Sequence, residues 1–400
     1  MRWLPYIVAI GLCVPWLAIA FGGQHPEPTV TALLSGVSIL GAAFLLSWAC
    51  EVAEEDVPQA LAVSVLALVA VLPEYAVDAT FAWKAASDPT HAGYAIANMT
   101  GGNRLMLGLG WSLVGLLTWV RSRRTVVELP RDVGAEVSVL LLSTVYALVP
   151  VWRGSLTLLD TGVYLTLYVL YLVAAARGEE HDHDQVGPAA ALAAQTPLVR
   201  RAGVLVLLVF AAGAIFIAAE PFAEALVLSG KHLGVDEFVL VQWVAPLASE
   251  SPEMVVATLM VWRGASSTGL RALISSSVNQ WTLLVGTLAV VYSIAKGEPS
   301  ALPLDGRQAA EVLLTAAQCL FGVAVIADLR LELWQVIVLV GLFVLQPILP
   351  DAHAAFGGVY LLLFVGILAL HKASRDGVGQ SFRTFYTLLR GGFPAQTPGP

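Results

Sequence analysis

Two glutamates, each directly after a proline, lie within long apolar stretches of the chain, at Pro73-Glu74 and Pro252-Glu253. An ionisable side chain costs about 2.5–3.5 kcal/mol at the centre of a bilayer and normally faces the interior of a helix bundle or a water-filled cavity. Proline cannot donate to the helix ladder, so carbonyl oxygens one turn earlier become free to face such a cavity. The repeated pair therefore predicts a functional site that offers carboxylate and carbonyl oxygens at membrane depth.

More oxygen-bearing side chains accompany each glutamate. Asp78 lies one helical turn after Glu74, and Glu250 lies three residues before Glu253, so each pair can share a helix face. Hard cations prefer carboxylate, amide and carbonyl oxygens as ligands. The predicted cation ligands are Glu74, Glu253, Asn103, Asn279, Asp78, Glu250, Asn98, Ser275 and Ser276.

The same acids allow two further interpretations. Crowded carboxylates can hold a proton between them, which makes proton coupling chemically available. Each acid could also be structural, because a buried carboxylate can hydrogen-bond across helices, and this alternative applies to Asp78 and Glu250 as well as to the two proline-associated glutamates. Ion binding is the main prediction, with a structural role as its alternative.

An arginine, Arg104, directly follows Asn103 within an apolar segment. Arginine keeps its charge in proteins, and at membrane depth it should pair with carboxylates. One hypothesis is that Arg104 acts as a tethered, charge-compensating cation that fills part of the space of a metal ion, which would favour a monovalent ion or proton coupling. The alternative is a structural salt bridge with Asp78 or Glu74.

The composition places this site in a membrane. Of the 400 residues, 58% are hydrophobic and 12% are charged, which excludes an ordinary soluble core and predicts an all-α integral membrane protein. The net charge of −8 and the scattering of basic residues over loops argue against nucleic acid as a partner. The sequence has no His-Glu-x-x-His, Gly-x-Ser-x-Gly or paired-aspartate motif of an enzyme. The expected partners are inorganic cations and the lipid bilayer, without a cofactor.

Apolar runs of about 20 residues are needed to cross the hydrocarbon core. About twelve transmembrane helices are predicted, near 4–21, 30–50, 58–83, 95–119, 133–151, 156–176, 201–228, 236–262, 268–295, 306–327, 331–349 and 355–371. Cytoplasmic loops carry an excess of Lys and Arg, and with the N terminus inside fifteen basic residues fall on the cytoplasmic side and five outside. We expect a multi-pass protein of the cell (inner) membrane with both termini in the cytoplasm.

The two halves of the chain repeat one pattern. In each half an acidic turn precedes the proline–glutamate helix, and a small-residue helix with an asparagine follows it. Spans 2–6 and 7–11 then form two inverted five-helix repeats, with one extra helix at each end. The expected divisions are 1–29 for the extra N-terminal helix, 30–176 for the first half, 177–200 for a cytoplasmic linker, 201–350 for the second half, and 351–400 for the extra C-terminal helix and a tail that is poorly ordered after Lys372.

These motifs resemble those of the cation/calcium exchanger superfamily, of the sodium/calcium exchanger type. Each of that family's two alpha repeats carries a Gly-Thr-Ser-x-Pro-Glu helix and a Gly-Asn-x-x-Gly-Ser-Asn helix, with five spans in each half. Residues 233–253 are similar to the second repeat, and residues 95–103 to the asparagine helix of the first. The resemblance covers about 30–350 and implies a divergent prokaryote-type member with alpha repeats near 58–119 and 236–295.

The chain departs from the family pattern before each Pro-Glu pair. Val69-Ala70-Val71 and Ala248-Ser249-Glu250 stand where the family has Gly-Thr-Ser. The hydroxyl and carbonyl ligands associated with sodium are therefore largely missing from the first repeat, which weakens the case for sodium coupling.

The resemblance implies a secondary-active cation antiporter that exchanges Ca²⁺ for H⁺ or Na⁺ by alternating access at a carboxylate site near the membrane midplane. The alternatives are a Na⁺ or K⁺/H⁺ exchanger on the same fold and a non-transporting membrane scaffold with a degenerate site.

Overall fold

The computed structural model describes residues 3–56, 71–178, 187–349 and 352–391. Within these ranges the protein is helical apart from four short strands, so the expectation of an all-α fold holds for the spans but not for every connection. Residues 58–70, the first half of the span expected near 58–83 with Val69 and Ala70 among them, lie outside the described residues, as does part of the linker expected at 177–200.

The first half of the chain contains the helices that carry Glu74 and Asn98. Its elements are α1 (Leu4–Phe21), α2 (Pro28–Ala53), α5 (Leu72–Lys84), α6 (Thr90–Leu105), a π-helical segment (Met106–Trp111), α7 (Ser112–Ser122), β1 (Val126–Glu128), a 3₁₀ turn (Arg131–Val133), α8 (Gly134–Tyr146), α9 (Leu148–Arg153), β2 (Ser155–Leu156) and α10 (Leu158–Ala175).

The second half begins after a short helix, α11 (Ala189–Ala193), that packs on α2. Its elements are α12 (Pro197–Leu233), α13 (Glu237–Arg263), α14 (Ser266–Asn279), a second π-helical segment (Gln280–Leu284), α15 (Val285–Lys296), β3 (Leu302–Pro303), α16 (Gly306–Ile326), β4 (Arg330–Glu332), α17 (Leu333–Ile348), α18 (His353–Leu370) and α19 (Lys372–Arg390).

Nine helices or continuous helical runs of the described chain are long and apolar enough to cross a membrane. Of the twelve predicted spans, those near 58–83, 236–262 and 331–349 are not among them. Only the part from Leu72 onward of the first is described, α13 has 27 residues but carries Glu250, Glu253 and several polar groups, and α17 has 16 residues. Polar site residues and short length therefore explain the difference.

Capping residues set the ends of the site helices. Asp236 accepts a hydrogen bond from the backbone N–H of Val239 at 3.2 Å and starts α13, and Gly264 ends it at φ +96°. The two prolines of the repeated pairs sit differently, because Pro73 lies in the first turn of α5 whereas Pro252 lies inside α13. Glu74 consequently lies in the first turn of α5, where the helix dipole favours a negative charge.

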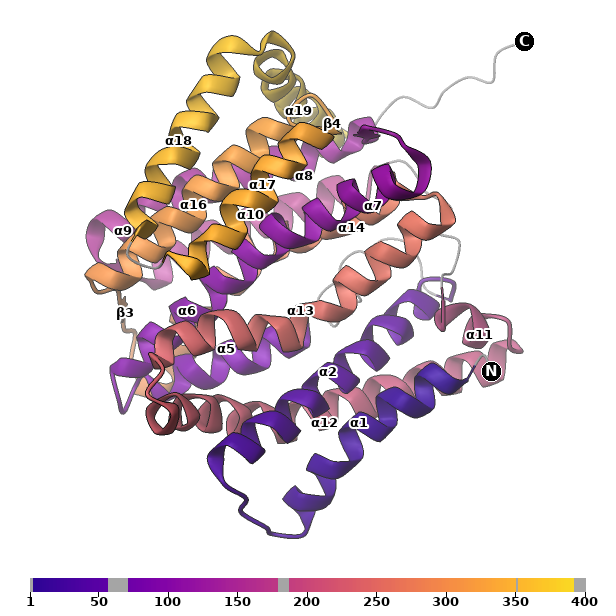
Figure 1. The fold of residues 1–400 in the computed structure, drawn as a ribbon, viewed down its shortest axis with the longest axis vertical. Coiled ribbons are helices and arrows are strands. Elements are labelled where there is room, and N and C mark those ends of the chain that lie inside the picture. The colour runs from indigo at the N-terminus through magenta and orange to yellow at the C-terminus, as the bar shows by residue number, and fades with distance from the viewer. Residues whose placement is uncertain (1–2, 57–70, 179–186, 350–351, 392–400) are drawn as a thin grey trace.

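The helices form two groups with α13 running between them (Figure 1). On one side α2 packs along both α1 and α12, and on the other side α18 packs on α16. Helix α13 contacts α2, α5 and α6 from the first half and α14 from the second. The helices that carry the predicted ligands therefore meet at the centre of the bundle.

Each of the two small antiparallel sheets joins one half of the chain to the other. Strand β1 pairs with β4, with Val127 opposite Leu331, and β2 pairs with β3, with Leu156 opposite Leu302. In Figure 1, β3 and β4 lie at opposite ends of the bundle. The halves are thus tied together at both ends, a feature that the sequence pattern did not predict.

The C-terminal tail contradicts the expectation of poor order as far as residue 391. Helix α19 packs on α8, α10 and α18, and Phe385 and Leu388 are buried. A β-carbon at Gly377 would overlap the backbone of Ala327, so the two segments approach closely there. This packing uses apolar residues on one face of an otherwise polar helix. The expectation of poor order was wrong because it considered the polar composition of the tail and not this spacing.

An ion-pair cluster connects the end of α2 to the start of α12. Asp56 accepts hydrogen bonds from Arg200 at 2.8 and 2.9 Å and from Arg201 at 2.9 Å. The hydrogen bonds from Arg200, together with the charge of both guanidinium groups, hold the pKa of Asp56 below its usual range. The two first helices of the halves are therefore joined by a charge-assisted bond.

Replacing Asp56 with asparagine should lower the Tm of the detergent-solubilised protein. Because the folded pKa of Asp56 is depressed, its contribution is present above the unfolded value of about 4 and is lost only as pH falls through the lower folded value. The difference in Tm between the wild type and Asp56→Asn should therefore be the same at pH 7 and pH 5. A difference that disappears at pH 5 would contradict this assignment, and Glu55→Gln, which removes a longer contact to Arg200, should change Tm less.

Candidate functional site

A glutamine amide joins two of the predicted acids. The Nε2 atom of Gln280 donates to Oε1 of Glu74 at 3.0 Å and to Oε1 of Glu250 at 3.1 Å. All three side chains are buried, with at most 4% of their surface exposed. Glu253 lies near enough to interact electrostatically with both carboxylates. Helices α5 and α13 thus bring three acids together, as predicted, and Gln280 is the donor that sequence reasoning did not select.

A second acid–amide pair flanks this cluster. Asp78, one turn after Glu74 on α5, accepts a hydrogen bond from Nδ2 of Asn98 on α6 at 2.9 Å. Both side chains are buried, and Asp78 interacts electrostatically with Glu74. The predicted shared face of Glu74 and Asp78 and the predicted contribution of α6 are therefore present.

Many buried oxygens on these helices accept no hydrogen bond from any described residue. They are Glu74 Oε2, Asp78 Oδ2, Asn98 Oδ1, Asn103 Oδ1, Glu250 Oε2, Glu253 Oε2, Ser276 Oγ, Asn279 Oδ1 and Gln280 Oε1. Leaving a buried acceptor without a donor costs about 1–3 kcal/mol of folding stability. These acceptors lie on α5, α6, α13 and α14 with the π-helical segment that follows it, and so come from both halves of the chain. A cation or a proton could supply the partner that they lack.

Two glycines allow helix α6 to approach α13. A β-carbon at Gly101 would overlap the backbone carbonyl of Gln242, and one at Gly102 would overlap Oε1 of Glu250. Glu250 consequently lies directly against the backbone of α6. The close approach places the first-half amides beside the second-half acids.

The remaining predicted ligands are divided between this region and other contacts. Asn103 uses its Nδ2 to donate to the Met99 carbonyl at 2.9 Å, so its oxygen stays without a donor among the described residues. Ser275 lies toward Glu136 of α8, with its Oγ 3.5 Å from Oε1 of that acid. Ser276 Oγ and Asn279 Oδ1 are thus among the buried oxygens without a donor from the described residues, whereas Ser275 faces another helix.

Arg104 is fully buried and pairs with an acid that the sequence analysis did not consider. Its Nη2 lies 2.8 Å from Oε2 of Glu311 on α16, and its Nη1 donates to Oε1 of Gln346 at 3.3 Å. Its guanidinium carbon also lies 5.7 Å from the ring centre of Trp243. Arg104 therefore forms a salt bridge, but the expected partners, Asp78 or Glu74, are wrong, because the guanidinium contacts Glu311 on α16.

Glu311 is the centre of a second polar cluster. Besides Arg104, it contacts Nε2 of Gln242 at 2.9 Å and Nδ1 of His353 at 2.7 Å. His353 is partly buried at this contact, with 16% of its side chain exposed. The signal that selected Glu74, an acid within an apolar span, also applies to Glu311 and would have found it.

The carboxylates do not form a ready-made metal cage. Among the described residues, no group of three or more His, Cys, Asp or Glu side chains is arranged to hold a metal ion. A cation held between Glu74 and Glu250 would need the amide and hydroxyl oxygens around them as further ligands, since Ca²⁺ takes six to eight oxygens. The donor set is chemically suitable, and the Gln280 amide now holds the two acids.

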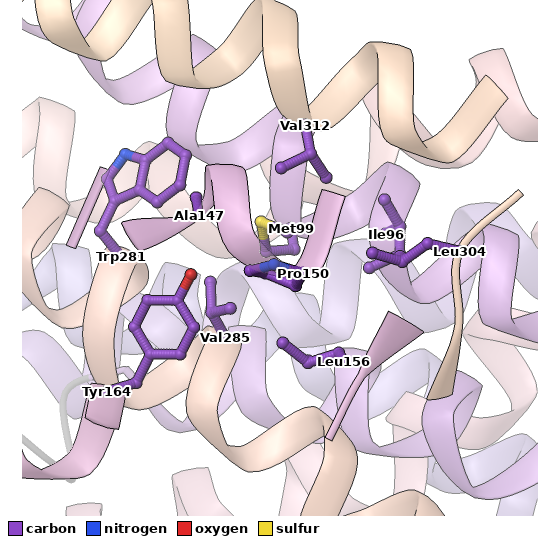
Figure 2. Close-up of a pocket in the computed structure, with 10 residues that line it drawn as sticks. All are labelled: Ile96, Met99, Ala147, Pro150, Leu156, Tyr164, Trp281, Val285, Leu304 and Val312. Carbon is purple, nitrogen blue, oxygen red and sulfur yellow. The ribbon is translucent and has the colours of Figure 1, made fainter. Parts of the chain in front are cut away.

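A small cavity lies apart from the acids (Figure 2). It has a volume of about 20 Å³ and is lined by Ile96, Met99, Ala147, Pro150, Leu156, Tyr164, Trp281, Val285, Leu304 and Val312. These side chains are apolar or aromatic, and a space of this size holds about one water molecule. The cavity therefore does not have the chemistry of a cation site.

Comparisons with known proteins agree with this geometry. The family model described as sodium/calcium exchanger protein matches residues 28–177 and 203–349. A solved structure described as H⁺/Ca²⁺ exchanger CAX is 41% identical, covers 97% of this chain and 98% of its own, and superposes with a TM-score of 0.92. No curated protein sequence matches the chain.

More distant structures share the fold alone. The sodium-calcium exchanger NCX_Mj soaked with 100 mM Na⁺ and 10 mM Sr²⁺ is 19% identical, with coverage of 80% of this chain and 98% of that one and a TM-score of 0.54. Native YfkE is 14% identical, with coverage of 91% and 100% and a TM-score of 0.64.

Gly101→Ala should destabilise the protein by about 1–3 kcal/mol, because the added methyl group meets a backbone carbonyl that cannot move aside. The measurement is thermal unfolding of the purified protein in detergent. Gly213→Ala on α12 is the control, because a β-carbon there meets no atom within 4 Å. If both variants unfold like the wild type, the close approach of α6 and α13 is not required.

Arg104→Met should cost about 3–5 kcal/mol, because it leaves Glu311 buried without its charged partner. The double variant Arg104→Met/Glu311→Gln should recover part of this loss, as measured by thermal unfolding of the single and double variants. A double variant as unstable as the sum of the two single ones would contradict the pairing.

Proposed function

This chain belongs to the sodium/calcium exchanger protein family, and we propose that it exchanges Ca²⁺ for protons across the membrane by alternating access. It is a multi-pass membrane cation exchanger and not an enzyme. The observation that carries the proposal is the cluster of the buried Glu74 and Glu250 with the half-buried Glu253, among oxygen acceptors that lack donors within the described chain.

The choice of protons as the coupling ion rests on the character of this cluster. Crowded carboxylates can carry protons when the divalent cation leaves, which removes the need for a sodium ion in the return step. Ala70 and Val71 supply no side-chain oxygen where the family motif has the hydroxyl groups of threonine and serine. The extensive likeness to a structure described as an H⁺/Ca²⁺ exchanger supports the same choice.

We assign the site roles as follows. Glu74 and Glu253 are the primary carboxylate ligands of the cation, and Glu250 lies beside them. Asp78 and its hydrogen-bond partner Asn98 lie next to this group of acids. Asn103, Ser276 and Asn279 add neutral oxygens, whereas Ser275 would act only after a change in the packing of α14. Release of Ca²⁺ and uptake of protons at these carboxylates keep the buried charge low in both steps, because an unpaired buried charge is costly.

Alternating access follows from the repeated halves. We propose twelve spans that comprise two inverted five-helix repeats and an extra helix at each end. Three parallels between the halves support this arrangement: a π-helical segment follows Asn103 and Asn279, each half begins with a long helix that packs on its counterpart, and each small sheet pairs a strand from each half. In such repeats one bundle rocks against the other around a fixed site.

The orientation completes the proposal. The excess of basic residues on one side assigns both termini to the cytoplasm and the protein to the inner cell membrane. This assignment makes the β1–β4 sheet cytoplasmic and the β2–β3 sheet external.

Proteoliposomes that contain the purified protein should take up Ca²⁺ when a proton gradient is imposed. Glu74→Gln and Glu253→Gln should each reduce this flux at least tenfold, because each removes a charged ligand, whereas the exposed Glu298→Gln should leave it unchanged. A panel of Na⁺, K⁺ and Ca²⁺ gradients identifies the ions. Normal flux in both glutamine variants would contradict the site, and no flux of any cation in the wild type would favour a non-transporting scaffold.

A further inference from the structure

The contact between Gln280 and two acids has an unusual division of partners. Both hydrogen bonds run from its nitrogen, one to Glu74 on α5 and one to Glu250 on α13. Its carbonyl oxygen is buried and receives no hydrogen bond from the described residues. The amide therefore uses its donor end fully while its acceptor end stays without a partner.

This arrangement suits two crowded acids that have no cation between them. A primary amide has two N–H donors, so one nitrogen can serve both acids and reduce their repulsion. The N–H hydrogens carry partial positive charge and are directed at both acids. No other described residue is shown to donate to both Glu74 and Glu250.

We propose that Gln280 is a positioning residue of the cation site, whose amide bridges Glu74 and Glu250 in the absence of a cation and turns over to present its carbonyl oxygen when a cation binds. This inference rests on the proposed function and adds a residue that the family motif of the sequence analysis does not contain. The terminal torsion of glutamine is broad and roughly two-fold, so the turn needs little free energy. The same oxygen accepts a hydrogen bond when a carboxyl group is protonated.

The backbone around Gln280 supports a moving part. Gln280 is the first residue of the π-helical segment that lies between α14 and α15. Such segments are rare and frequent at functional sites. Gln280 lies next to Asn279, so the amide that turns and a predicted neutral ligand occupy consecutive positions where the helix geometry changes.

The residue at the equivalent position of the first repeat, Arg104, does not have the role proposed for Gln280. Arg104 follows Asn103 as Gln280 follows Asn279, yet Arg104 pairs with Glu311 and not with the acid cluster. The acids thus meet a neutral, reversible partner from the second repeat alone. A site partner that can be displaced is needed for exchange, because a permanently charged one would compete with every cation.

Three variants of the full chain test the inference. Gln280→Leu removes both ends of the amide at similar volume, and Gln280→Glu keeps a carbonyl-type oxygen but cannot donate two hydrogen bonds. Gln335→Leu is the matched control, since Gln335 is buried and bonded to Glu332 at the start of α17. Two quantities are measured from pH 6 to pH 8: the Ca²⁺ concentration that gives half-maximal thermal stabilisation in detergent, and Ca²⁺/H⁺ flux in proteoliposomes.

We expect Gln280→Leu to raise the half-stabilising Ca²⁺ concentration about tenfold, the scale of one lost neutral ligand, and to shift the flux profile to higher pH. Gln280→Glu should match or improve on the wild-type Ca²⁺ concentration, because its oxygen can bind the cation, while its flux profile also moves to higher pH. Gln335→Leu should alter neither quantity beyond a change in Tm without Ca²⁺.

Other outcomes overturn the inference. Wild-type Ca²⁺ dependence in Gln280→Leu at every pH would show that the amide takes no part, and a Gln280→Glu variant as impaired as Gln280→Leu would show a fixed structural donor. Absence of Ca²⁺ stabilisation in the wild type would remove the cation from the site and overturn the inference as well. Stabilisation with the expected order of variants but without wild-type flux would support the inference and contradict the proposed exchange.

Discussion

The main physical constraint on this structure is that several carboxylates lie close together inside a membrane, which is energetically costly. Each buried acid needs a donor, a proton or a cation, because an isolated charge in a medium of low polarity is unstable. At Glu74 and Glu250 the shared hydrogen-bond donor is one neutral amide. The site is therefore held in a state that a cation or a proton can complete, which is the physical requirement for exchange.

The surrounding fold makes this arrangement possible by closing the distance between two halves of the chain. Gly101 and Gly102 let α6 contact α13, and the two small sheets connect the halves at both ends of the bundle. The peripheral helices α1 and α18 add contacts on opposite sides (Figure 1). In the proposed mechanism, alternating access takes place by a change in the relative tilt of the bundles.

The sequence predicted the acids because they break a strong rule, that membrane spans avoid ionisable groups. It also predicted that Glu74 and Asp78 share a helix face, since spacing within a helix is fixed. It did not predict that Gln280 bridges the acids, that Glu311 pairs with Arg104 or that α19 packs on α8. These contacts join residues far apart in the chain, and helical spacing gives no information about which distant helix lies opposite a side chain.

The difference between Arg104 and Gln280 follows from what each can release. A guanidinium keeps its charge, so inside the acid cluster it would neutralise the carboxylates permanently and compete with the transported ion. Paired with Glu311 on α16, the same charge instead fixes the helix that carries Asn103. An amide carries no net charge and can be turned by its partners. In our proposal the two repeats thus use one sequence position for opposite purposes, Arg104 to hold a helix and Gln280 to yield to a cation.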